Sequence, residues 1–122
     1  MTTAPLHGGE LLTAISTRIV GLMREHYGRG PSRAKTYTFD DLLICVLRDE
    51  GAIPIEETML EGGNSEGVLE LRRGFQRIMG ERYKAEVELL TGRKVVAFLS
   101  QAHVDPDLTV ELFQLDRPLD EA

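Results

Sequence analysis

The stretch AKTYTFDDLLICVLR, residues 34–48, decides how the rest of the chain is arranged. Two runs rich in aromatic, β-branched and aliphatic residues, 34–39 and 42–48, are separated only by Asp40 and Asp41. A connection of two residues suits a hairpin turn, so the stretch predicts two antiparallel strands. Two aspartates are a weaker turn signal than Asn-Gly, because a turn residue with positive φ then lacks the freedom of glycine.

The second of these strands is apolar on both sides. Residues 42, 44 and 46 are apolar, and so are residues 43, 45 and 47. The run 95–99 repeats the pattern, with Val95, Ala97 and Leu99 alternating with Val96 and Phe98. Successive side chains of a strand point to opposite faces of the sheet. The pattern therefore predicts a sheet whose two faces both need to be covered.

Amphipathic helices flank the first hairpin. Upstream, apolar residues recur every three or four positions over 9–27, and this helix is expected to end at Gly28, before Pro31. Downstream, residues 65–91 predict a long helix that Asn64 or Ser65 caps and Gly92 ends. Its expected apolar stripe consists of Val68, Leu71, Phe75, Ile78, Met79, Tyr83, Val87 and Leu90. Gly74 and Gly80, which weaken a helix, suggest close packing of a neighbouring element.

Two further segments complete the predicted order. Residues 53–60, with Pro54 suited to a first helical position, predict a short helix. Residues 94–104 and 108–115 predict a second hairpin around the turn 105–107. We therefore expect one α+β domain over 1–122 with its core at about 9–116 and a frayed tail at 116–122. Its order is α-β-β-α-β-β: a four-stranded antiparallel sheet with the two main helices packed on one face.

Charge and hydropathy exclude several classes of partner. The net charge of −6 repels nucleic acid and anionic lipid. No run approaches the roughly 18 apolar residues of a spanning helix, and the first residues do not resemble a secretory signal. We expect a cytoplasmic protein without direct membrane insertion.

No catalytic or metal-binding constellation stands out. The three histidines lie in separate predicted elements, and the single cysteine, Cys45, sits in an apolar run where it acts as a small hydrophobe. Nucleophile elbows, phosphate-binding loops and dinucleotide fingerprints are absent from the sequence. We expect no metal, no cofactor and no enzymatic activity, with an enzyme only as a third hypothesis.

One basic segment suggests a ligand site. Arg29, Arg33 and Lys35 follow the first helix near two glycines and could hold an anion, with Tyr27 and Tyr37 as an apolar wall. Cations are also favoured at a helix C-terminus by the helix dipole, without any ligand. Both readings stay open at this point.

The apolar second face gives the stronger hypothesis. Helices on one face of the sheet would leave the other apolar face in water, and such a patch usually marks an interface. We expect a homodimer through this face, or a partner protein. The sequence leaves open whether the two hairpins pair within one chain or exchange between chains.

Several short motifs in a fixed order add a family context. YGRGP at 27–31 with the hairpin behind it, PIEETML at 54–60 and LTGRKVV at 90–96 resemble the MpsC family of small bacterial proteins. The resemblance covers roughly residues 11–116. Arg29 and the pair Glu56-Glu57 depart from the family pattern, where lysine and alanine-glutamate are more frequent.

The resemblance implies a soluble accessory component of a cation-translocating, membrane-potential-generating or bicarbonate-supplying system, in which other members carry out transport. It transfers no catalytic residues. Our first hypothesis is thus a non-catalytic accessory or interaction protein, possibly docking onto a membrane complex. The alternative is a small-ligand or anion-binding sensor that uses Arg29, Arg33 and Lys35.

Overall fold

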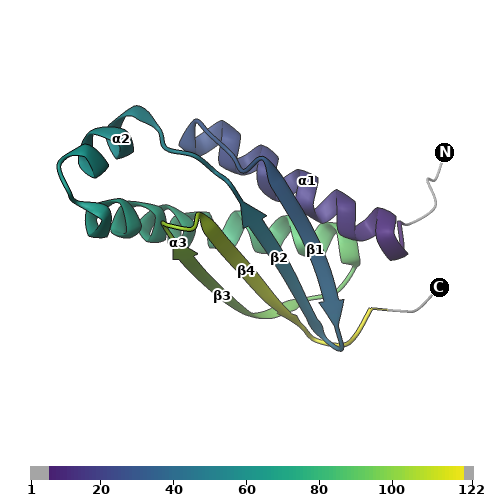
Figure 1. Ribbon diagram of the computed structural model, residues 1–122. Helices are drawn as coiled ribbons and strands as arrows, with labels where there is room; N and C mark the ends of the chain where they lie inside the picture. Colours follow the sequence, from purple (N-terminus) through teal and green to yellow (C-terminus); the bar gives the residue numbers. More distant parts are fainter. Residues whose placement is uncertain (1–5, 120–122) are drawn as a thin grey trace.

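The computed structural model describes residues 6–119, which form one four-stranded sheet with two long helices across one face (Figure 1). The helices are α1 (Gly8–Tyr27), α2 (Pro54–Glu61) and α3 (Ser65–Thr91), and the strands are β1 (Arg33–Phe39), β2 (Leu42–Arg48), β3 (Val95–His103) and β4 (Leu108–Leu115). The predicted α+β class and the α-β-β-α-β-β order are confirmed, with α2 as the predicted short helix. Residues 120–122 of the predicted frayed tail lie outside the described residues.

The two hairpins join into one sheet within the chain. Its strand order is β1-β2-β4-β3, and β2 and β4 pair antiparallel from Leu42 opposite Gln114 to Arg48 opposite Leu108. The predicted turn at residues 40–41 is confirmed, and Asp40 takes the positive φ of 56°. Aspartate tolerates this left-handed conformation better than most residues, which explains how the turn forms without glycine.

Helix α3 begins and ends where the sequence indicates, but its buried face is only partly the predicted one. Asn64 caps the helix by accepting a 2.9 Å hydrogen bond from the N–H of Gly67, and Gly92 ends it at φ 68°. Ile78, placed on the apolar stripe, is 77% exposed, and Leu71 is exposed too. The polar residues Arg72 and Gln76 are buried instead. Specific polar partners, described below for Arg72, override the apolar pattern.

The predicted role of the two α3 glycines is correct for one of them. A Cβ atom on Gly80 would lie 3.0 Å from the ring of Phe98 on β3, so a larger residue here would push the Phe98 ring outward, and glycine allows the close approach of helix and sheet. Near Gly74 the nearest such contact is the end of the Arg77 side chain at 4.0 Å, so Gly74 packs against no neighbouring element. The core between helices and sheet consists of Leu11, Ile15, Ile19, Met23, Leu43, Cys45, Leu47, Met79, Tyr83, Val87, Phe113 and Leu115.

A buried arginine fastens the end of the molecule where α2 lies. Arg72 is 3% exposed and Glu56 is fully buried. The Arg72 guanidinium donates to both Glu56 carboxylate oxygens at 2.8 and 3.1 Å, to the Gly51 carbonyl at 2.9 Å and to Asp107 Oδ1 at 3.2 Å. The Tyr27 hydroxyl adds a 2.5 Å hydrogen bond to Glu56. This Arg72 cluster connects α3, α2, the 49–53 segment, the β3–β4 turn and the end of α1.

Hydrogen bonding keeps the Glu56 carboxylate charged inside the protein. Burial alone would raise its pKa, but hydrogen bonds from Arg72, Tyr27 and the Ile53 N–H together hold the pKa below its ordinary value. Glu50, next to this cluster, accepts no comparable set of bonds. Burial raises the pKa of Glu50 to about 7, against the opposing effect of the Arg72 charge.

A third buried carboxyl lies in the middle of the sheet. Glu111 on β4 is fully buried and faces the helices together with Thr109 and Phe113. Its Oε1 accepts a 2.9 Å hydrogen bond from Ser100, whereas its Oε2 has no hydrogen-bond partner. Burial raises the pKa of Glu111 to about 8, partly offset by the Ser100 hydrogen bond. The folded protein thus favours the protonated carboxyl.

Removal of Arg72 should leave a buried charge unpaired. We expect Arg72→Met to lower the free energy of unfolding by about 3–5 kcal/mol, because Glu56 keeps its charge without its main partner. Arg73→Met, at the neighbouring exposed position, is the control and should change stability by less than about 0.5 kcal/mol. Urea unfolding measures both variants, and equal losses would contradict the role given to Arg72.

Glu111 should make stability depend on pH. Its pKa is about 8 in the folded chain and near 4.5 when unperturbed, so its contribution is most favourable below pH 4.5 and is lost as pH rises toward 8. Glu111→Gln should remove this loss, so that the variant gains stability relative to wild type between pH 5 and about 8. The exposed change Glu70→Gln serves as control, and parallel curves for wild type and Glu111→Gln would refute the assignment.

Candidate functional site

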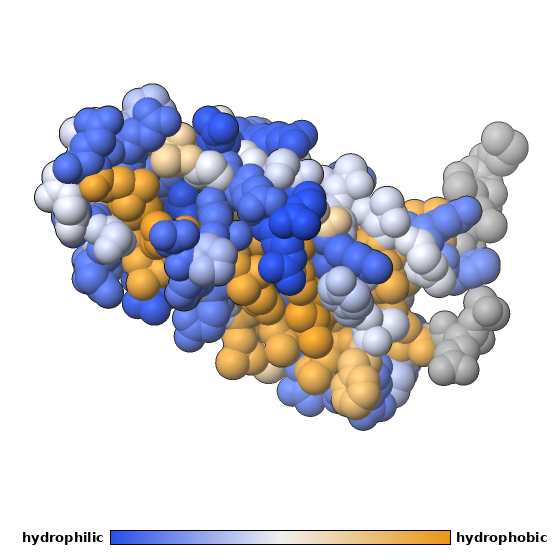
Figure 2. Space-filling model, viewed as in Figure 1, coloured by the Kyte–Doolittle hydropathy of each residue, from blue (hydrophilic) through white to orange (hydrophobic). Residues whose placement is uncertain are grey.

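The face of the sheet opposite the helices is largely apolar. In the view of Figure 2, a broad hydrophobic area covers the strands and is bordered by hydrophilic residues. Pairing of the strands places ten apolar side chains on this outer face: Tyr37, Phe39, Leu42, Ile44, Val46, Ala97, Leu99, Leu108, Val110 and Leu112. The prediction that both faces of the sheet carry apolar residues is confirmed.

Exposure is highest on the two edge strands. Phe39 and Tyr37 on β1 are 73% and 46% exposed, and Leu99 on β3 is 59% exposed. The residues of β2 and β4 between them are partly buried by their neighbours in the sheet, as at Ile44 and Leu112. Single exposed apolar residues are normal on a protein surface, but a continuous sheet face is the kind of patch that binds a partner.

Cross-strand rows divide the outer face into an apolar and a polar half. The row Tyr37–Ile44–Leu112–Leu99 is wholly apolar. The row at the end where β2 finishes consists of Arg33, Arg48, Leu108 and His103. Apolar contact is thus concentrated in the centre and toward the β1–β2 turn, with charge at the margin.

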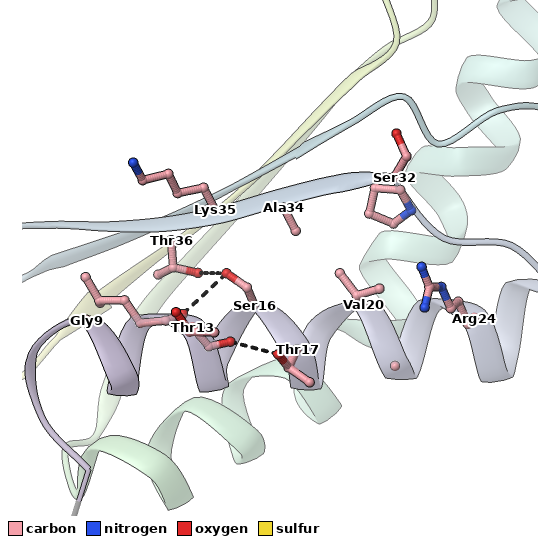
Figure 3. Close-up of a pocket in the computed structure, with 13 residues that line it drawn as sticks. Gly9, Thr13, Ser16, Thr17, Val20, Arg24, Ser32, Ala34, Lys35 and Thr36 are labelled. Carbon is pink, nitrogen blue, oxygen red and sulfur yellow. Dashed lines mark hydrogen bonds between the residues drawn. The ribbon is translucent and has the colours of Figure 1, made fainter.

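Beside the sheet edge, α1 and β1 form a groove of about 550 Å³ (Figure 3). Ser16 and Thr36 join its walls through a buried 2.7 Å hydrogen bond between their hydroxyls. Arg24 extends from α1 at one end of the groove, whereas the Lys35 side chain points away from α1 (Figure 3). The two cations therefore do not converge on one point, and the groove lacks a focused charge.

The structure also places the three residues of the predicted ligand site. Arg29 donates to the carbonyl oxygens of Glu50 and Ala52 at 3.1 and 3.4 Å. Arg33 forms an ion pair with Asp49, with its Nη2 2.7 Å from Oδ2.

Lys35 lies on the outer face, with its ammonium 5.1 Å from the centre of the Tyr37 ring. Arg29 and Arg33 thus hold the 49–52 segment, and Lys35 stands apart from them. Anion binding by the three together stays a prediction.

Within residues 6–119, no group of three or more His, Cys, Asp and Glu side chains is arranged to hold a metal ion. Glu56 is bound on both oxygens, and Glu111 is enclosed between sheet and helices. Cys45 is fully buried, as predicted, and burial raises the pKa of its thiol to about 11, which disfavours the reactive thiolate.

Sequence reasoning did not predict that β4, the second central strand, also places apolar side chains on the outer face. Leu108, Val110 and Leu112 alternate with Thr109 and Glu111, a pattern that alone would place the apolar set toward the helices. The structure places Thr109 and Glu111 inward, because they share a face with Phe113 and Leu115. Phe113 and Leu115, two large apolar residues at the end of the strand, occupy the same alternate positions as Thr109 and Glu111. This pattern could have predicted that all four side chains face the helices.

Comparison with known proteins identifies the family. The model of the family described as "Na+-translocating membrane potential-generating system (MpsC)" matches residues 7–117. No curated protein and no solved structure matches the chain. Within the described part of the chain, no helix is both long and apolar enough to cross a bilayer. The match extends from the start of α1 to beyond the end of β4, and the chain belongs to the MpsC family.

Proposed function

We propose that this protein is a non-catalytic accessory component of a membrane-potential-generating system and acts by binding protein through the outer face of its sheet. The family match supplies the link to such a system. The apolar outer face is the observation that supports binding as the mode of action. The protein would work in the cytoplasm, beside the membrane proteins that carry out transport.

The extent of the outer face supports this role. Four strands about 4.8 Å apart and seven residues of about 3.4 Å rise each span roughly 450 Å², and apolar side chains occupy ten of the sixteen outward positions in the paired rows. Apolar patches of a few hundred Å² on a monomer are often functional, since leaving apolar area in water forgoes about 25 cal/mol per Å². A bound protein surface would recover that free energy.

Protein is a better partner for the outer face than lipid. The chain carries a net charge of −6, which opposes approach to an anionic membrane surface. The face is also formed by strands, whereas peripheral insertion typically uses an amphipathic helix. A flat apolar surface on another protein chain meets both conditions.

The test is complementation in a cell that has lost the gene for this protein. Wild-type protein should restore the membrane potential, measured with a voltage-sensitive dye. Ile44→Lys, which places a charge at the centre of the outer face, should not restore it. Ile78→Lys is the matched control, because Ile78 is 77% exposed on α3, outside the outer face.

Purified Ile44→Lys must first show a wild-type circular dichroism spectrum and cooperative thermal unfolding, so that misfolding is excluded. If the folded Ile44→Lys protein restored the potential as well as Ile78→Lys did, the proposed use of the outer face would be wrong.

A further inference from the structure

The geometry of the outer face points to a specific occupant: we propose that a second copy of this chain covers it, face to face, around a two-fold axis. This inference rests on the proposed function, because it names the protein that the outer face binds. Its support is the distribution of charges around the apolar centre.

Charges alternate in sign at the corners of the outer face. At the end of the sheet where β1 begins, the β1–β2 corner carries the exposed cations Arg33, Lys35 and Arg48, of which Arg33 is paired with Asp49, so the corner stays basic through Lys35 and Arg48. At the opposite end, the turn between these strands carries Asp40 and Asp41. One side of the face is therefore basic at one end and acidic at the other.

The β3–β4 side has the reverse polarity. Its turn, at the same end as Arg48, carries the exposed Asp105. The far end carries the exposed cations Lys94, just before β3, and Arg117, just after β4, against one exposed acid, Asp116. Going around the face, the corners are thus basic, acidic, basic and acidic.

This alternation makes the face complementary to itself. Stacked sheets align their strands within about 30°, so a two-fold axis runs nearly along or nearly across the strands. An axis across the strands brings Arg48 toward Asp41 of the second copy. An axis along the strands brings Arg48 toward Asp105 of the second copy. Either arrangement opposes unlike charges, and each occurs twice because the interface is symmetric.

The apolar rows fit both arrangements as well. With the axis across the strands, Val46 and Val110 oppose Ile44 and Leu112 of the other copy. With the axis along the strands, Ile44 opposes Leu112 of the other copy. Charge therefore selects the second copy as partner, and apolar contact provides most of the affinity.

Charge exchange between copies tests the proposal. Sedimentation equilibrium of the wild-type protein should show a dimer at micromolar concentration. Arg48→Glu, Asp41→Lys and Asp105→Lys each place like charges opposite each other, twice per dimer, when they meet a copy of themselves. Arg48→Glu, and the aspartate variant whose position lies opposite Arg48 in the dimer, should each raise the dimer Kd about tenfold or more.

Mixing identifies the contact. An equimolar mixture of Arg48→Glu with Asp41→Lys should dimerise like wild type if the axis runs across the strands. Rescue by Asp105→Lys instead would show an axis along the strands, and either rescue supports the proposal. Asp41→Ala controls for loss of the Asp41 hydrogen bond from Gln114, and Arg73→Glu on α3 controls for the change in net charge.

Two results would overturn the proposal: a wild-type monomer up to the highest soluble concentration, or mixtures no better associated than the separate variants. Either failure is distinguishable from failure of the proposed function. A monomer that loses complementation through Ile44→Lys would keep the functional proposal and exclude the second copy. A charge-dependent dimer with full complementation by Ile44→Lys would do the reverse.

Discussion

A four-stranded sheet with apolar residues on both faces and helices on only one is the constraint on which the rest of this structure depends. Helices α1 and α3 cover the inner face and bury a core that includes Leu43, Cys45, Leu47 and Phe113. The short α2 lies at the end of α3 and leaves the outer face open (Figure 1). The outer face is therefore the largest apolar surface that these helices leave uncovered.

In the interior, Arg72 binds Glu56, Asp107 and the Gly51 carbonyl, so one side chain joins segments that are far apart in the sequence. A buried ion pair adds little net stability over well-packed apolar residues, but its loss is costly, and its geometry admits few alternatives. The Arg72 cluster consequently fixes where the 49–53 segment and the β3–β4 turn lie at one margin of the outer face.

The sequence predicted the elements well because their signals are local. Glycine after α1 and α3, Asn64 before α3 and the two-residue turn at 40–41 act through the backbone of a few neighbouring residues. The apolar pattern of β2 also predicted the second face correctly. The apolar pattern of α3 was wrong at Ile78, which is exposed. It also did not predict the burial of Arg72, because that burial depends on Glu56 and Asp107, partners that only the folded chain brings near. Arg29 and Arg33 were likewise recognisable as cations, but not as the residues that hold the 49–52 segment.

The strand order leaves β1 and β3 as the two edges of the sheet. An irregularity in β3 affects whether another sheet could pair with that edge. The register of β3 against β4 shifts between Val95 and Ala97. Such a bulge bends the strand and breaks the regular row of backbone donors and acceptors that another sheet would need. At the other edge, the charges of Arg33 and Lys35 hinder the same kind of pairing. Both edges thus disfavour the addition of a further strand, so the sheet faces, not its edges, are the surfaces suited to contact.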